Sequence, residues 1–376
     1  EYNLTGKVIR TFTSLDHQVK YELDPNGRVT KLTTAKDQSL SFERDARGLE
    51  IGREMPGEMR MEQRFDSMGR LLDQRVGKKG YREFATSPGS VPSRISPNTE
   101  KIQRNYSYDQ DGLLLSIKDA QWGNTEYGYD PVERLLSAFR DKGVSESFEF
   151  DANDNITLMQ KQNGAPSESA LTYGPGNRIQ QRGNTIYEHD LDGRLTKKIE
   201  DANSDQQQVW EYYWDAQGQM KGLLRPDGGE WTYKYDAFGR RTAKIGPTSA
   251  NRFLWNGDII IHEINLDQRI ASWVIKPGNF EPLAKVQAGA MFNVINDHLG
   301  TPRKLLDGQG KVVWDSTFSV WGSSEQEIVS TDIECPIRFQ GQWFDEESGL
   351  HYNRFRYYDP RSARYIGPDP IGISGD

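Results

Sequence analysis

The stretch "WTYKYDAFGRRTAKI", residues 231–245, contains the pattern that decides the fold. Its first half alternates aromatic and polar residues with the period of two that is expected of a strand with one buried face. A tetrad Asp-x-x-Gly follows, in which Asp236 would cap a tight turn and Gly239 would accept a positive φ as the next strand begins. The stretch therefore predicts a β-hairpin.

This tetrad recurs along the chain. Full copies begin at Asp24, Asp45, Asp66, Asp109, Asp190, Asp215, Asp236 and Asp307. Two degenerate copies, at Asp130 and Asp151, keep the spacing but lose the glycine, and the steps 24–45–66 and 109–130–151 are each 21 residues. One tetrad is common turn chemistry in any β protein, but eight copies with a recurring period indicate a repeat architecture.

The segments between the tetrads also follow a pattern. An aromatic residue often stands directly before the Asp, and a basic residue followed by aliphatic residues often comes after the Gly. The chain shows no apolar stripe of helical period. We therefore predict an all-β fold in which hairpins stack into a spiralling shell, a β-cage or solenoid. A Pro- and Ser-rich loop near residues 84–98 interrupts the repeats.

Composition narrows the class of protein. The 376 residues carry a formal charge of -8, which argues against a nucleic-acid-binding surface. Mean hydropathy is low, at -0.80, but 11% aromatic residues favour a folded chain over a disordered one. A single cysteine excludes an internal disulfide, and no apolar run is long enough to span a membrane. Because the first residue is Glu1 and no signal peptide is visible, we expect a piece of a longer protein.

The tyrosine–aspartate pair within a period of about 21 residues resembles the YD repeats of Rhs (rearrangement hot spot) proteins, which also occur in toxin-complex C subunits and teneurins. The last third is more specific: residues 252–264, 296–322 and 339–373 resemble the Rhs-associated core. The third of these segments reads "FQGQWFDEESGLHYNRFRYYDPRSARYIGPDPIGI". The resemblance implies a YD-repeat shell over residues 1–250 and an Rhs-associated core with a C-terminal autoproteolysis motif over residues 251–376.

This resemblance implies a function. YD repeats wind into a hollow cage that the core closes, and in bacterial members a variable toxin domain follows the core and is held inside. The core then cuts the chain after a DPxGL-like sequence, which here implies a scissile bond between Ile373 and Ser374. The implied partners are the toxin cargo and a secretion-system spike, a chaperone or an immunity protein. The implied route is export from the bacterial cytoplasm by a specialised system such as type VI secretion.

Acidic residues in the last segment are candidates for this cleavage. Asp345, Glu346, Glu347, Asp359 and Asp369 are interleaved with Arg354, Arg356, Arg361 and Arg364. Peptide hydrolysis by carboxylates needs two acids that share a proton, and a nearby arginine keeps one of them ionised. Carried over from the resemblance, the catalytic pair of a single-turnover aspartyl autoprotease is Asp369 and Asp345, with Arg356 assisting. Asp359 is a second choice, because it could equally cap a turn, and a solvated salt-bridged hairpin surface is the alternative explanation for these charges.

Three positions depart from the family pattern. Ile373 stands in place of Leu before the cut, Ala363 in place of Gly, and Gly367 in place of Ser. Branching at Cβ next to the scissile bond would slow cleavage by this chain.

Other chemistry finds little support. The five histidines are scattered, and His262–Glu263 lacks the second histidine of a zinc motif, so we expect neither metal nor cofactor. Acids adjoin histidines at Asp16, His189 and Asp297, and we interpret these residues as parts of turns or strand ends. A rival function is a non-enzymatic adhesion or carbohydrate-binding module presenting rows of Tyr and Trp. The fixed repeat position of these aromatic residues favours packing instead.

Overall fold

The computed structural model describes residues 1–15, 17–84, 93–163, 165–329 and 333–370. They form 34 strands and one short 3-10 turn, η1 (Pro175–Asn177), so the all-β prediction is confirmed. Within these ranges no helix is long and apolar enough to cross a membrane. Thirty strands make one antiparallel sheet in which each strand pairs with the next along the chain, except that β7 pairs with both β8 and β9.

The first half of the large sheet comprises β1 (Arg10–Phe12), β2 (Gln18–Leu23), β3 (Val29–Thr34), β4 (Ser39–Arg44), β5 (Glu50–Met55), β6 (Met59–Phe65), β7 (Leu71–Phe84), β8 (Ser93–Ile95), β9 (Ile102–Tyr108), β10 (Leu114–Asp119), β11 (Gly123–Tyr129), β12 (Leu135–Arg140), β13 (Ser145–Phe150), β14 (Ile156–Asn163) and β15 (Ala165–Gly174). The second half comprises β16 (Arg178–Arg182), β17 (Thr185–His189), β18 (Leu195–Glu200), β19 (Gln208–Trp214), β20 (Met220–Leu224), β21 (Glu230–Tyr235), β22 (Arg241–Ile245), β23 (Ala250–Asn256), β24 (Ile259–Asn265), β25 (Ile270–Ile275), β26 (Pro282–Gln287), β27 (Ala290–Asn296), β28 (Pro302–Leu306), β29 (Val312–Phe318) and β30 (Ser324–Val329). A separate sheet contains β31 (Trp343–Asp345), β32 (Leu350–Asn353), β33 (Arg356–Asp359) and β34 (Arg364–Tyr365).

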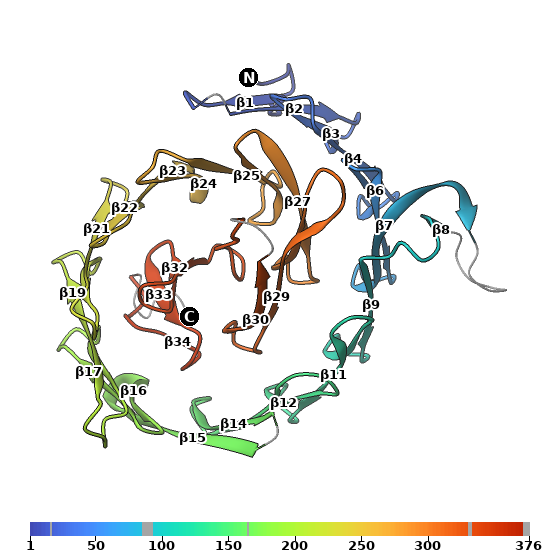
Figure 1. Ribbon diagram of the computed structural model, residues 1–376. Helices are drawn as coiled ribbons and strands as arrows, with labels where there is room; N and C mark the ends of the chain where they lie inside the picture. The colour runs from blue at the N-terminus through green and yellow to red at the C-terminus, as the bar shows by residue number, and fades with distance from the viewer. Residues whose placement is uncertain (16, 85–92, 164, 330–332, 371–376) are drawn as a thin grey trace.

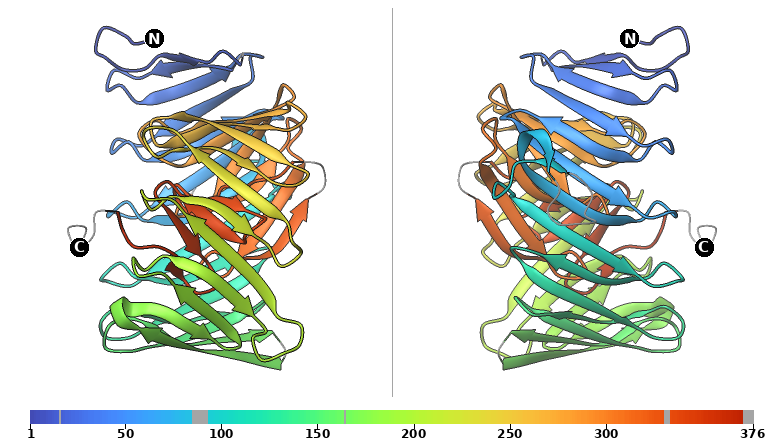
Figure 2. Two further views of the ribbon diagram at one scale, coloured as in Figure 1. Left: turned by 90° about the vertical axis from the view of Figure 1, so that its left-hand side faces the viewer. Right: turned by 90° about the vertical axis from the view of Figure 1, so that its right-hand side faces the viewer.

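The large sheet winds into a spiral of more than one turn (Figure 1). Strands β1 to β22 run around the ring, and the later strands β25 to β30 pass inside the turn made by the first strands. The side views show the same strands as tilted bands around a central axis (Figure 2). Among the described residues the sheet does not close on itself, because β1 pairs only with β2 and β30 only with β29.

The Asp-x-x-Gly tetrads make the turns that the sequence predicted. At residues 236–239, one carboxylate oxygen of Asp236 accepts hydrogen bonds from the N–H groups of Phe238 (2.9 Å) and Arg240 (3.0 Å), while Gly239 has a φ of 73°. The strand register shifts by one residue at this turn, as it does at most other copies. The repeated tetrad therefore encodes a repeated turn.

A Tyr or Trp at the end of several strands, directly before the turn, joins neighbouring hairpins. The Tyr235 hydroxyl donates to the carbonyl oxygen of Met220 (2.8 Å), and the Trp214 indole N–H donates to that of Leu195 (2.7 Å). Tyr129, Tyr173 and Trp255 make the equivalent bonds. These side chains are partly buried, so their rings and their polar groups are both used within the wall.

Two features of the turns refine the sequence pattern. The degenerate copies keep the turn, since Glu133 and Asp154 adopt the left-handed φ values of 67° and 61° that glycine adopts elsewhere. The search for repeats also missed a copy at Asp297, whose carboxylate accepts from the N–H groups of Leu299 (2.9 Å) and Thr301 (3.0 Å). This Asp was interpreted as a turn or strand-end residue, and it caps a turn of the repeat type.

Two turns of the spiral pack on each other through an apolar layer. Leu32, Leu40 and Met59 of the outer turn lie in one buried cluster with Leu283, Ala284, Met291 and Leu306 of the inner turn. Gly57 marks a close approach of the two backbones, because a Cβ there would lie 2.7 Å from the carbonyl oxygen of Gly308. Burial of this layer stabilises the spiral through the hydrophobic effect.

Residue 250 does not interrupt the sheet, since β22 pairs with β23 across it. The structural change along the chain comes later, where the second sheet begins at Trp343. The division at residues 250 and 251 stays a prediction.

Candidate functional site

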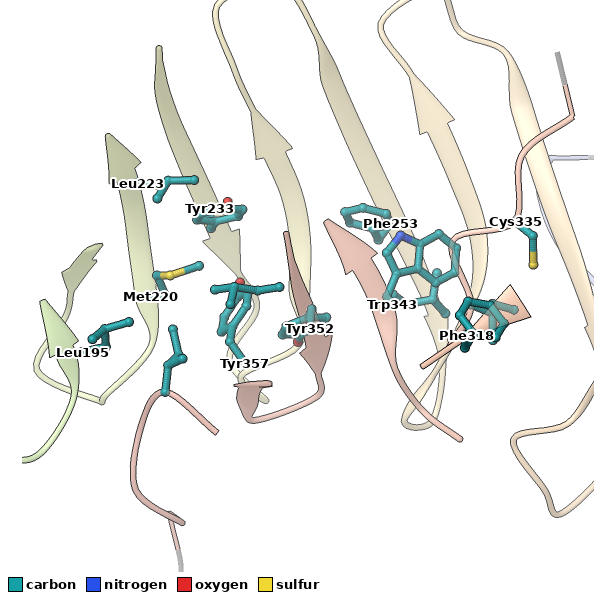
Figure 3. Close-up of a cluster of buried hydrophobic side chains, with 14 of the residues drawn as sticks. Leu195, Met220, Leu223, Tyr233, Phe253, Phe318, Cys335, Trp343, Tyr352 and Tyr357 are labelled. Carbon is teal, nitrogen blue, oxygen red and sulfur yellow. The ribbon is translucent and has the colours of Figure 1, made fainter. Parts of the chain in front are cut away.

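The small sheet β31–β34 lies inside the ring and packs against the inner face of β18 to β25 (Figure 1). Figure 3 shows Trp343 beside Phe253, and Tyr352 and Tyr357 facing Tyr233 and Met220. The rings of Trp343 and Phe253 meet edge to face with centroids 5.7 Å apart. We call residues 333–370 the core segment.

A buried ion cluster joins the core segment to the wall. Asp345 is completely buried, and its Oδ1 accepts hydrogen bonds from the Arg241 guanidinium (2.8 Å) and from the Lys244 ammonium (3.1 Å). Its Oδ2 accepts a second bond from Arg241. Lys244 also donates to Glu347 (3.0 Å), and the Tyr233 hydroxyl donates to the other oxygen of Glu347 (2.9 Å). Arg241 and Lys244 belong to β22, and the two acids belong to the core segment.

The two carboxyls of this cluster differ in pKa. Burial alone would raise the pKa of Asp345, but the charges of Arg241 and Lys244 hold it below its ordinary value. Burial and the neighbouring Asp345 charge raise the pKa of Glu347. The ion pair of Arg241 and Asp345 is therefore the charged link, and Glu347 is the weaker acid beside it.

Asp369 and Arg356 form a second, more accessible site. Their side chains make an ion pair with a distance of 2.9 Å between Nη1 and Oδ2, and each is about one-third exposed (29% and 36%). Arg356 begins β33, and its guanidinium stacks 3.7 Å from the centroid of the Tyr365 ring. The pair lies on a cavity of about 300 Å³, which is also lined by Gln217 and Gly218 of a hairpin turn.

Tyr357 lies between the two sites. The structure places Asp369 beside Arg356, while Asp345, the acid that the sequence analysis paired with Asp369, has the separate partners Arg241 and Lys244. Tyr357 lines the Asp369 cavity, and its hydroxyl accepts a hydrogen bond from Arg241 (3.3 Å). Asp345 is thus linked to the Asp369 cavity through Arg241 and Tyr357.

The other acid considered from sequence is explained by its turn. Asp359 is buried, and its carboxylate accepts from the Arg361 N–H and from the Ser362 hydroxyl, both at 2.9 Å. It caps the turn after β33.

Sequence reasoning missed the cations Arg241 and Lys244. The signal was present, because the repeats place an aliphatic residue two positions after the Gly, as at Leu195, and Arg241 stands at that position. An arginine at an inward-facing position needs a buried partner, and Asp345 is that partner.

The departures from the family pattern have different structural consequences. Ala363 adopts a φ of 58°, a left-handed value that favours the glycine usual there. A Cβ at Gly367 would lie 3.6 Å from the Trp214 ring, an ordinary contact, so a serine would also fit. Ile373 and Ser374 lie outside the described residues, as do Asp16 and residues 85–92 of the predicted insert loop.

Metal and thiol chemistry have little basis in the site. Within the part of the chain that the structure describes, no group of three His, Cys, Asp or Glu side chains could hold a metal ion. Burial raises the pKa of Cys335 to about 11 and lowers that of His262 to about 4, so both are neutral at pH 7.

Known proteins share sequence similarity with this chain over most of its length. The Teneurin YD-shell family model matches residues 97–374. The chain is 30% identical to the probable deoxyribonuclease RhsA of Dickeya dadantii, over 99% of this chain and 25% of that protein. It is 27% identical to double-stranded DNA deaminase toxin A of Burkholderia cenocepacia, over 100% and 28% respectively, and 28% identical to toxin protein Tse5 of Pseudomonas aeruginosa, over 89% and 29%.

Solved structures agree on the fold. The crystal structure of TcdB2-TccC3-Cdc42 superposes with a TM-score of 0.71 at 15% identity, covering 99% of this chain and 22% of that one. The chain spans about a quarter of the length of these curated relatives. With the repeated YD turn, the spiral sheet and the family match over residues 97–374, the chain belongs to the YD-shell family of Rhs-type proteins.

Proposed function

We propose that this chain is part of the encapsulating shell of an Rhs-type polymorphic toxin, which encloses a C-terminal toxin domain and severs it by self-cleavage. The observation that carries the proposal is the Arg356–Asp369 ion pair, placed where the core segment lies against the inner wall of the spiral. The curated relatives include toxins that are about four times longer than this chain. We assign their DNA-directed or other toxic activities to the parts that this chain does not cover.

The wall is suited to hold cargo. Its sheet curves around a central axis, and its own C-terminal strands already occupy the inner side (Figure 1). The described strands leave the sheet open, so closure of the shell by the core segment requires further wall from the longer protein or from a partner chain. A spike, a chaperone or an immunity protein would then act on the closed shell, and a dedicated bacterial secretion system would export it.

The cleavage chemistry centres on Asp369. A carboxylate that faces a peptide bond can activate water and then return the proton to the leaving amine. Arg356, at 2.9 Å, holds the Asp369 carboxylate in place through their ion pair. Because the substrate is the same chain, the scissile bond is presented at a very high effective concentration and needs no binding cleft. We place this bond between Ile373 and Ser374.

Asp345 acts at a distance in this proposal. Its carboxylate is enclosed by Arg241 and Lys244 and does not line the Asp369 cavity. We therefore assign it a positioning role, in which it fixes Arg241 and, through it, the Tyr357 hydroxyl at the wall of the cavity.

The experiment is the intact mass of the full-length protein that contains this chain. We expect the wild type to give two fragments with a new N-terminus at Ser374, and Asp369→Asn to give one uncut chain. Arg356→Gln should slow cleavage, since the Asp369 carboxylate would lose the charge-assisted hydrogen bond that holds it in place. Asp227→Asn is the matched control, because Asp227 is 61% exposed and pairs with Arg225, and neither residue lines the Asp369 cavity.

An uncut wild type, or a cut Asp369→Asn chain, would overturn the protease assignment. The proposal that the chain is part of a shell would still stand. If the wild type is cut and gives a new N-terminus other than Ser374, the catalytic assignment of Asp369 stands and the scissile bond lies at that other position. The adhesion or carbohydrate-binding alternative is less well supported. The polar groups of Trp214, Tyr235 and Trp255 already donate hydrogen bonds to backbone carbonyls within the wall.

A further inference from the structure

A cavity of about 660 Å³ separates the outer turn of the spiral from the inner turn. The outer wall contributes residues of β9 to β12, and the inner wall contributes residues of β28 to β30. These strands face each other across the lower right of Figure 1. We call this space the interlayer cavity. It is distinct from the Asp369 cavity, and the proposed cleavage does not use it.

Buried polar groups without partners line the interlayer cavity. Tyr106 and Arg104 are 5% and 3% exposed, and among the described residues the Tyr106 hydroxyl and the Arg104 Nη2 find no hydrogen-bond partner. The same holds for Arg303 Nε, Trp122 Nε1 and His298 Nδ1. All five side chains line the cavity. One acceptor of the lining, Glu325 Oε1, also lacks a hydrogen-bond partner among the described residues, and the donors outnumber it. A buried donor left without a partner costs about 1–3 kcal/mol, so this excess of donors at one cavity indicates a missing acceptor.

One buried cation of the cavity lining lacks a close acidic partner. Arg104 is paired with Asp119 at 2.6 Å, and Arg140 is paired with Glu325. Arg303 has only the Asp297 carboxylate at 3.9 Å, which already caps a turn. Burial and the charge of Arg104 lower the pKa of Arg303.

Aromatic rings form another part of the lining. The guanidinium of Arg303 lies 5.4 Å from the centroid of the Phe318 ring, and the rings of Tyr106 and His298 lie 5.2 Å apart. Tyr127 and Trp122 complete this apolar surface. The volume falls within the range of small-molecule sites, which are mostly apolar with a few convergent polar groups.

We propose that the interlayer cavity binds a carboxylate attached to an aromatic or apolar body. The carboxylate would accept hydrogen bonds from Arg303, Arg104 and the Tyr106 hydroxyl, and it would thereby supply the acceptor that these donors lack. The apolar body would lie against Phe318 and Trp122. The same chemistry comes from a free organic acid or from an acidic residue next to an aromatic one in an enclosed polypeptide.

Isothermal titration of the intact chain with benzoate tests the proposal, with benzamide as the neutral isostere. We expect benzoate to bind with a stoichiometry of one and benzamide not to bind. Tyr106→Phe keeps the ring and removes only the hydroxyl, and it should weaken benzoate binding about fivefold, while Arg303→Gln should weaken it about tenfold or more. Arg252→Gln is the control, because Arg252 is exposed on β23 and its substitution removes the same charge away from the cavity.

The source of the carboxylate is decided by two peptides, acetyl-Phe-Asp-amide and acetyl-Phe-Asn-amide. Binding of the Asp peptide that is lost in Tyr106→Phe would assign the cavity to a polypeptide, and binding of benzoate alone would assign it to a free acid. The proposal would be overturned if neither benzoate nor the Asp peptide binds, or if benzamide binds as tightly as benzoate. It would also be overturned if both variants bind benzoate as tightly as the wild type does. If Arg303→Gln does not fold, the comparison of ligand binding uses Tyr106→Phe alone. An unchanged thermal midpoint of Tyr106→Phe without ligand shows that this variant is folded.

Discussion

The substitution Asp345→Asn removes the negative charge at the centre of the link between the core segment and the wall. The side chain keeps its size, but Arg241, completely buried, loses its two charge-assisted hydrogen bonds, and Lys244 keeps only Glu347. The guanidinium cannot deprotonate or reach water, so it remains as an uncompensated buried charge.

The expected cost follows from this geometry. Breaking a buried pair by removing one partner costs about 3–5 kcal/mol, whereas an exposed pair contributes less than about 1 kcal/mol. Asp345→Asn should therefore lower the free energy of core-segment opening by about 3–5 kcal/mol. The double variant Asp345→Leu with Arg241→Met removes both charges and should recover most of this loss, because apolar replacement of a buried ion pair is often close to neutral.

Native-state hydrogen exchange of the β32 and β33 amides measures this opening directly. Exchange should accelerate about 100-fold or more in Asp345→Asn, return toward the wild-type rate in the double variant, and stay unchanged in the exposed control Asp227→Asn. An acceleration of Asp345→Asn no greater than that of Asp227→Asn would refute the reasoning. The core segment would then be held to the wall by its aromatic contacts alone.

Three further predictions concern the wall and its pH dependence. Glu133→Gly should raise the unfolding free energy by about 1 kcal/mol, because the exposed Glu133 has a φ of 67°, and urea unfolding checks this. Gly57→Ala should lower it by about 2–5 kcal/mol in the same assay, through strain at a φ of 76° and the clash with the inner turn. The lowered pKa of Asp345 contributes stability that is present above the ordinary carboxyl pKa and is lost as the pH falls through the folded value. The thermal midpoint should thus fall in acid, and it should fall less in the variant Asp345→Leu with Arg241→Met.

Much of the fold could be predicted because its information is local. The Asp-x-x-Gly tetrad places its cap and its glycine within four residues, so Asp236 and Gly239 specify a turn without reference to the rest of the chain. The aromatic residue before the Asp bonds one hairpin back, within about 20 residues. The path of the spiral is not local: the inner turn meets the outer turn at Gly57 and Gly308, more than 200 residues apart in the sequence.

The site was predicted less completely for the same reason. Asp369 and Arg356 lie 13 residues apart in one motif, and the structure brings them together. The partner of Asp345 lies 104 residues away on β22, and no periodicity in the core segment points to it. A residue that breaks the repeat pattern, such as Arg241 in an aliphatic position, is the signal that would have linked the two.

Protease protection of the full-length protein tests enclosure, the central claim of this account. After self-cleavage, the released segment should co-elute with the shell in size-exclusion chromatography and resist trypsin until urea unfolds the shell. It should become sensitive at the same urea concentration at which the wall unfolds. A released segment that elutes separately from the shell, or that trypsin digests as fast as the isolated segment, would contradict the claim.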